Sequence, residues 1–67
     1  MQEFILGQKW KMTDPLFGTF VGEVADVSED EMSGTVIIFD DLGNEVDVFT
    51  GTAAEFQASG EWRLMDD

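Results

Sequence analysis

The amino-acid sequence predicts an all-β fold, a small five-stranded barrel with one short helical turn before the last strand. Most apolar residues fall in short segments that alternate with polar residues, as in strands with one buried face. Glycine-containing polar segments separate them, and one helix signal occurs, near the C-terminal end. At 67 residues the chain is expected to form a single domain, 1–67, with room for one core and none for a deep cleft.

The first long strand is expected at Thr19–Val27, which is rich in β-branched and aromatic residues. Gly22 interrupts this segment, and we expect a bulge or a sharp bend there. The segment Ser28–Gly34 that follows is polar and acidic and ends in glycine, which is typical of a loop.

A β-hairpin follows this loop. Thr35–Asp40 is predicted as a buried strand because it is apolar on both faces. The connection Asp41–Asn44 is predicted as a tight turn, since Gly43 and Asn44 tolerate the positive φ that such turns require.

The second strand of the hairpin, Glu45–Thr50, alternates strictly. One face, predicted to be core, contains Val46, Val48 and Thr50, and the opposite face contains Glu45, Asp47 and Phe49. Phe49 is then either covered by the N-terminal segment or exposed as a contact residue beside the carboxylates.

The helix signal lies after this strand. Thr52 and Glu55 have the spacing of a capping box, and Gly60 is expected to stop the helix after one or two turns. A last strand is predicted at Glu61–Met65, with Trp62 and Leu64 on one face. This order of elements is typical of an SH3-like small barrel. An OB-fold is the second alternative, and a two-layer arrangement of hairpins and a helix is the third.

The N-terminal third supports this fold by resemblance. The segments Phe4–Trp10 (FILGQKW) and Leu16–Val21 (LFGTFV) resemble the start of the Tudor-like N-terminal region of RapA-type Swi/Snf ATPases, which associate with bacterial RNA polymerase. The resemblance covers about a third of the chain and includes no catalytic motif. It implies a Tudor-like, SH3-like barrel and a protein contact related to transcription.

The charge of the chain excludes several classes of function. There are 15 acidic and 3 basic residues, giving a net charge of −12, and 13 of the acids lie after Gly22. Direct binding to nucleic acid or to an anionic membrane is disfavoured, because both require basic residues. The chain has no Cys, His or Tyr, so we expect no enzyme, no cofactor and no metal site, and no disulfide. It has no long apolar run, and a cytoplasmic protein is the default expectation.

The acidic residues are the candidate interaction site. If the loop and the hairpin fold to the same side, they form a negative stripe that a basic protein surface would accept in place of phosphates. The alternative is a solvated surface that serves solubility or a high-salt cytoplasm. The predicted partner-binding residues are Glu29, Asp30, Glu31, Asp40, Asp41, Glu45, Asp47 and Phe49.

Two other kinds of site are alternatives to this one. The oxygen donors between Asp40 and Asp47 suit a hard cation, but their spacing does not fit an EF-hand loop. Trp10, Phe17 or Phe49 could line an aromatic cage for methylated Lys or Arg, as in Tudor-like domains, although such residues are more often core.

The sequence therefore predicts a non-enzymatic acidic interaction module, a monomer or weak dimer. Its predicted partner is the basic surface of another protein, with which it would act as a DNA mimic or as an inhibitor in transcription or nucleic-acid processing. The alternatives are an accessory small barrel and a reader of modified peptides.

Overall fold

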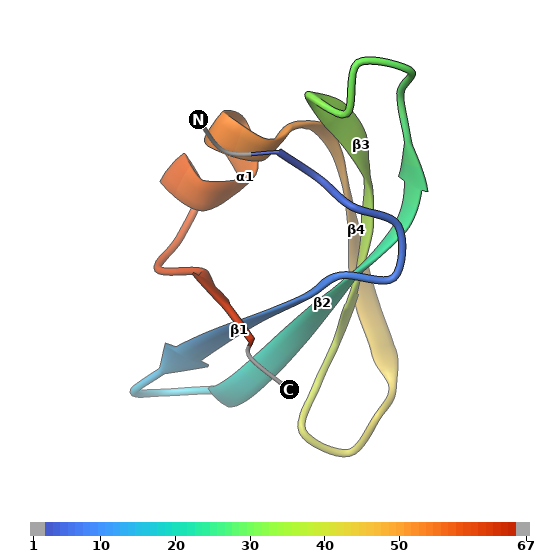
Figure 1. The fold of residues 1–67 in the computed structure, drawn as a ribbon. Helices are drawn as coiled ribbons and strands as arrows, with labels where there is room; N and C mark the ends of the chain where they lie inside the picture. Colours follow the sequence, from blue (N-terminus) through green and yellow to red (C-terminus); the bar gives the residue numbers. More distant parts are fainter. Residues whose placement is uncertain (1–2, 66–67) are drawn as a thin grey trace.

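The computed structural model describes residues 3–65, which form one five-stranded antiparallel sheet and one short helix (Figure 1). The elements are β1 (Lys9–Asp14), β2 (Gly18–Val27), β3 (Ser33–Phe39), β4 (Glu45–Thr52), α1 (Ala53–Ala58) and β5 (Arg63–Leu64). The mostly-strand fold and the helical turn before the last strand are thus confirmed. The last strand is shorter than predicted. β3 begins two residues earlier and ends one residue earlier than predicted, and β4 extends two residues beyond its predicted end.

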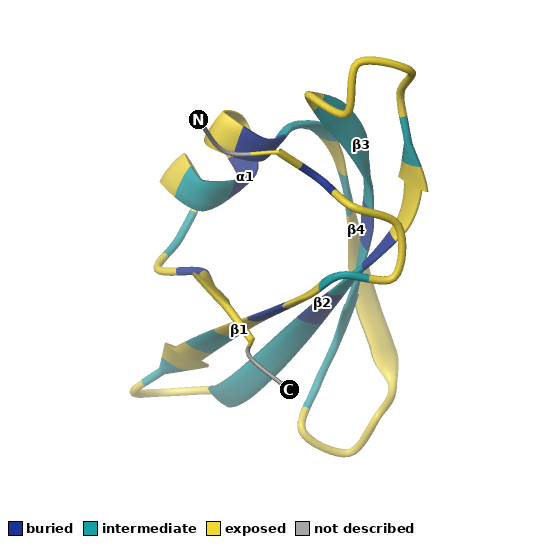
Figure 2. Cartoon of the chain, in the orientation of Figure 1, coloured by how far each residue is buried: buried dark blue, intermediate teal, exposed yellow. Residues whose placement is uncertain are grey.

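The sheet is curved but open. Its strand order is β4-β3-β2-β1-β5, so β4 and β5 are the two edges, and the predicted closure into a barrel is not observed among residues 3–65. The buried residues lie on the concave side of the sheet, which faces α1 (Figure 2). The core cluster consists of Phe4, Trp10, Val24, Val36, Ala53, Phe56 and Trp62.

Phe56 occupies the centre of this core. Its ring is stacked on Trp62 at a centroid distance of 4.6 Å and meets Phe4 and Trp10 edge-on at 5.9 Å and 5.8 Å. Aromatic pairs at these distances add to the stabilisation from burial alone. The six-residue helix therefore contributes to the fold mainly by placing one aromatic ring in the concave side of the sheet.

Gly22 is required by this packing and not by a bulge. It pairs regularly with Trp10 on β1 and Ile38 on β3, while the irregularity of β2 falls between Val24 and Asp26. A Cβ at Gly22 would lie 2.8 Å from Val36 Cγ1 and 3.2 Å from Phe56 Cζ. The expectation of a bulge at Gly22 is therefore wrong, because the pairing is regular there and core side chains occupy the space above the glycine.

The prediction that Val46 and Val48 lie on the core face of β4 is also wrong. Val46 and Val48 are 51% and 49% exposed, whereas Phe49 packs against Phe56 at a centroid distance of 5.1 Å. Phe49 lies opposite the buried Val36, so the concave face of β4 is the one with Phe49 and not the one with Val48. A register shift between Ile38 and Phe39 leaves Val46 as the extra residue of a β-bulge.

Local signals determined the turns and the helix start as predicted. Thr52 Oγ1 accepts a hydrogen bond from the Glu55 N–H at 3.1 Å, and Glu55 Oε1 accepts one from the Thr52 N–H at 3.0 Å, which completes the capping box. The helix ends at Ser59, a right-handed residue whose hydroxyl donates to the Phe56 carbonyl. Gly60 does not supply the stop in a left-handed conformation. It gives room instead to Met12 and Trp62, which lie within 3.4 Å of the position its Cβ would take.

Candidate functional site

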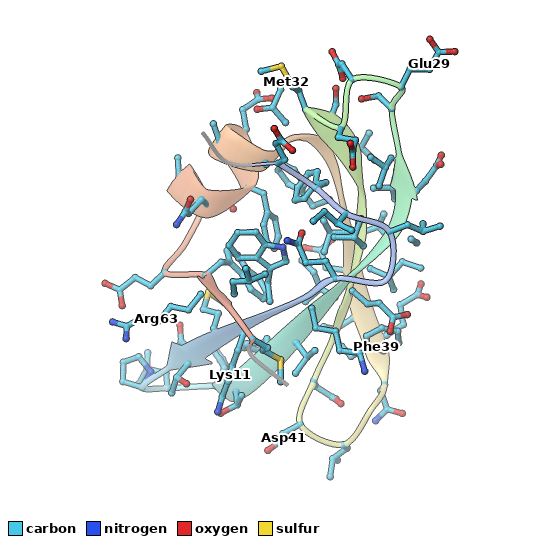
Figure 3. The ribbon with its side chains drawn as sticks, viewed as in Figure 1. Lys11, Glu29, Met32, Phe39, Asp41 and Arg63 are labelled. Atoms are coloured by element: carbon cyan, nitrogen blue, oxygen red, sulfur yellow. The ribbon has the colours of Figure 1, made fainter. Side chains whose placement is uncertain are left out.

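The predicted acidic residues fall into two groups at opposite ends of β3. Glu29, Asp30 and Glu31 are in the β2–β3 loop, before β3 begins, and Asp40 and Asp41 come directly after it ends. Seven residues at about 3.3 Å each place the two groups roughly 20 Å apart. Figure 3 shows Glu29 and Asp41 at the two ends of the molecule. The condition for one continuous negative stripe, that loop and hairpin fold to the same side, is not met.

In the loop group, the side chain of Asp30 has a structural role. Its Oδ1 accepts hydrogen bonds from the Ser28 hydroxyl at 2.6 Å and from the Met32 N–H at 3.0 Å. The Ser28 hydroxyl is the main reason that the pKa of Asp30 lies below its ordinary value. Glu29 and Glu31 are exposed, and the Glu31 carbonyl anchors the N-terminal segment by accepting from the Phe4 N–H at 2.9 Å.

The hairpin group is organised around Asp40. Its Oδ1 accepts from the N–H groups of Asn44 and Leu42, both at 2.9 Å, and these bonds hold the turn in shape. The bond from the Asn44 backbone contributes most to lowering the pKa of Asp40. Asp41, Glu45 and Asp47 are exposed, and the Asp47 carboxylate accepts a hydrogen bond from the Val48 N–H at 2.8 Å.

A second hairpin lies beside this one. The turn between β1 and β2 is closed by Asp14 Oδ1, which accepts from the N–H groups of Leu16 at 2.7 Å and Phe17 at 3.0 Å. Val21 pairs with Phe39, so the same register continued beyond β3 puts Thr19 opposite Asp41. A Cβ on Gly18 would lie 3.8 Å from Asp41 Oδ2, in agreement with that placement. We call the turns 14–18 and 40–44 together the two-hairpin end.

The two-hairpin end exposes large apolar side chains that were not predicted as site residues. Leu16, Phe17 and Leu42 are 84%, 75% and 82% exposed, the three highest values for large hydrophobic residues in the described part of the chain. Exposed apolar residues of this size beside charged ones are typical of protein-interaction sites. The sequence alone does not distinguish Leu16, Phe17 and Leu42 from core residues, because what exposes these side chains is their location at the tips of turns.

The three basic residues of the chain lie together on the convex face of the sheet. Lys11 pairs directly with Arg63 on β5, and Figure 3 labels both residues. Lys9 lies two residues before Lys11 and therefore on the same face of β1, opposite to the buried Trp10. The alternation Lys9-Trp10-Lys11 is the signal that could have predicted this. The surface is therefore polarised, with the cations at the β1–β5 edge and the hairpin carboxylates toward β4.

The alternative sites find no geometric support. Trp10 is buried and donates its indole N–H to Gln8 Oε1 at 3.1 Å, Phe49 packs in the core, and Phe17 lies at the β1–β2 turn, so these three aromatics do not line one cage. Among residues 3–65, no three or more acidic, His or Cys side chains are grouped as metal ligands. No polar or charged residue in that range is buried.

Comparison of the chain with protein-family models, curated proteins and solved structures finds no match. Within the part that the structure describes, no helix is long and apolar enough to cross a membrane.

Proposed function

We propose that this chain is a non-enzymatic protein-interaction module that binds the basic surface of another protein through its two-hairpin end. The observation that supports this most directly is that the exposed Leu16, Phe17 and Leu42 lie in two turns that approach each other at Gly18 and Asp41, and one of these turns carries the carboxylates of Asp40 and Asp41. Protein interfaces combine a few large apolar anchors with a charged, water-exposed rim. The two turns supply both on neighbouring, hydrogen-bonded hairpins.

The chemistry of the proposed partner follows from charge. A net charge of −12 attracts basic surfaces over long range, and Asp41, Glu45 and Asp47 would replace the phosphates that such a surface normally contacts. We therefore propose a DNA-mimic or inhibitor action on a protein of transcription or nucleic-acid processing. The element order, with one helical turn before the last strand, supports assigning the open sheet to the SH3-like, Tudor-like folds. The RapA-type resemblance makes bacterial RNA polymerase the first partner to test.

A second candidate function is an accessory domain whose acidity serves solubility or a high-salt cytoplasm. The observation that favours it is the distribution of acids over both ends of the sheet, since Glu29 and Glu31 are far from the two-hairpin end and exposed. Acidic side chains that serve only to hydrate the surface need no particular location in the fold. The two functions therefore differ in whether the position of a carboxylate matters.

A matched pair of triple variants tests this difference. Asp41→Asn/Glu45→Gln/Asp47→Asn removes three charges near the two-hairpin end, and Asp26→Asn/Glu29→Gln/Glu31→Gln removes three charges at the loop end. Binding to bacterial RNA polymerase and to a panel of purified DNA-binding domains is measured by biolayer interferometry, with and without competing duplex DNA. Asp40 and Asp30 are left intact because their carboxylates shape the turns.

We expect the hairpin variant to lose about tenfold or more in affinity, equivalent to about 1.4 kcal/mol, and the loop variant to stay within about twofold of the unmodified protein. Competing DNA is expected to displace the protein from its partner. Equal losses in the two variants would show that only total charge matters, and an absence of binding to the whole panel would refute the proposed function.

A further inference from the structure

β4 is a free edge of the sheet. It pairs with β3 on one side, and the strand order leaves its other side without a strand among residues 3–65. Edge strands present unpaired N–H and C=O groups that can pair with another extended chain. At eight residues, β4 is long enough to hold several such hydrogen bonds.

The hydrogen bonding of Val48 shows which backbone groups point outward. The Val48 N–H donates to Oδ1 of Asp47 at 2.8 Å, so a side chain of its own strand satisfies this amide and β3 does not. Because outward-pointing backbone groups recur at every second residue of an antiparallel edge strand, the N–H and C=O groups of Thr50 also point away from β3. Asp47 thus covers the outward Val48 N–H with a carboxylate, which a carbonyl acceptor of an added strand can replace.

An apolar hollow lies along this edge on the concave side. Met12, Phe20, Ile38 and Trp62 line it together with Val46 and Asp47 of β4. It opens where the sheet fails to close, so a chain that paired with β4 would have an apolar side chain directed toward it. Because Asp47 also lines the hollow, a carboxylate lies next to its apolar side chains.

We propose that β4 pairs with a cationic extended segment of the partner protein, which adds to the sheet as a sixth strand. Apolar residues in that segment are favoured by the hollow and by Val46 and Val48, which are about half exposed. Lys or Arg residues between these apolar residues are favoured by the carboxylates of Glu45 and Asp47. On binding, the Asp47 carboxylate leaves the Val48 N–H and pairs with an incoming cation. The proposal rests on the proposed function and names the part of the partner that is recognised.

Charge complementarity decides between this occupant and a second copy of the chain. A second copy would bring its own net charge of −12 to an edge that already carries the exposed Glu45 and Asp47, and like charges repel. A strand that contains Lys or Arg is attracted to the same carboxylates. The charge therefore favours a basic strand over a second copy of the chain.

The test uses an octapeptide in which Lys and Val alternate, and an isomer in which its four Lys residues are consecutive. Amide hydrogen exchange of the unmodified protein is followed by NMR with each peptide. Strand addition predicts that the alternating peptide slows exchange at Val48 and Thr50 by about tenfold or more and that the isomer does not. This readout needs no variant.

A matched pair of variants separates backbone pairing from charge. Val48→Pro removes the outward N–H, which an edge strand tolerates, and Val48→Thr keeps it. We expect Val48→Pro to lose at least about tenfold in peptide affinity and Val48→Thr to bind within about twofold of the unmodified protein. If Val48→Pro does not fold, a synthetic chain with N-methylvaline at position 48 replaces it.

The outcomes distinguish this inference from the proposed function. Binding of the peptide without protection of Val48 and Thr50, or equal binding by the Pro and Thr variants, overturns strand addition and leaves charge-driven binding standing. Dimerisation of the protein through β4, measured by sedimentation, also overturns it. Absence of peptide binding while the polymerase or a DNA-binding domain still binds refutes the sixth strand alone, and absence of both refutes both proposals.

Discussion

At the scale of single residues, the fold depends on a glycine beneath an aromatic ring. Phe56 contacts aromatic rings from the N-terminal segment, β1, β4 and the segment before β5, and it lies over Gly22, where a side chain would collide with it and with Val36. Interiors are packed too densely to absorb an added methyl group without movement. Gly22 is therefore as much a part of the core as the rings above it.

We expect Gly22→Ala to destabilise the protein by about 1–3 kcal/mol, because the new methyl group overlaps Val36 Cγ1. Val36→Ala removes that atom, so the double variant should cost less than the sum of the two single changes. Urea unfolding followed by the fluorescence of Trp10 and Trp62 measures all three. Strict additivity of the two single effects would contradict the overlap.

At the scale of elements, carboxylates close the turns that present the proposed site. In the described part of the chain, the groups with a lowered pKa are Asp30, Asp40 and Glu55, and each accepts hydrogen bonds within a turn or at the helix start. A carboxylate whose pKa is lower in the folded than in the unfolded state stabilises the fold above its unfolded pKa. That stabilisation is lost as the pH falls through the folded pKa.

For Asp40 the ordinary value is 3.8, so its contribution is complete at pH 7 and declines below about pH 4. Asp40→Asn should unfold at a lower urea concentration than the unmodified protein at pH 7, and the difference should disappear in strong acid. Asp41→Asn, which removes a neighbouring exposed charge, is the control for net charge. A difference between Asp40→Asn and the unmodified protein that persists unchanged at acid pH would contradict a role of the charged carboxylate.

At the scale of the whole molecule, charge is both abundant and unevenly placed. The net charge of −12 is distributed over two ends of an open sheet, while Lys9, Lys11 and Arg63 share one edge of its convex face. Self-repulsion of this size destabilises a compact state and keeps it soluble. The same charges thus oppose folding and favour the proposed encounter with a basic partner.

Salt should therefore stabilise the protein. Between 10 mM and 1 M NaCl the screening length falls from about 30 Å to about 3 Å, which shortens the reach of repulsion between the two acidic ends. We expect the melting temperature, measured by circular dichroism, to rise by about 4–8 °C for each kcal/mol gained. The interaction module is expected to be folded already at 10 mM salt. A chain that is unfolded there would favour the high-salt accessory function instead.

The sequence by itself determined the local structure of this protein. The hairpin turn at Asp41–Asn44, the capping box of Thr52 and Glu55, and the strands β2, β3 and β4 depend on residues a few positions apart, and these were predicted closely. No range was predicted for β1, and β5 is shorter than predicted. The acidic loop and hairpin were likewise predicted as exposed. Such features follow from backbone preferences and short-range hydrogen bonds, which need no knowledge of the rest of the fold.

Only the tertiary structure decided which side of each element is used. A one-residue bulge at Val46 and the position of Phe56 turned Phe49 into the core, exposed Val48 and made Gly22 a packing residue. The length of β3 separated the two acidic groups, the strand order left β4 at an edge of the sheet, and the register brought Asp41 close to Gly18 of the β1–β2 turn. These outcomes depend on contacts between distant segments, and a pattern with a period of two gives the same alternation whichever face is buried.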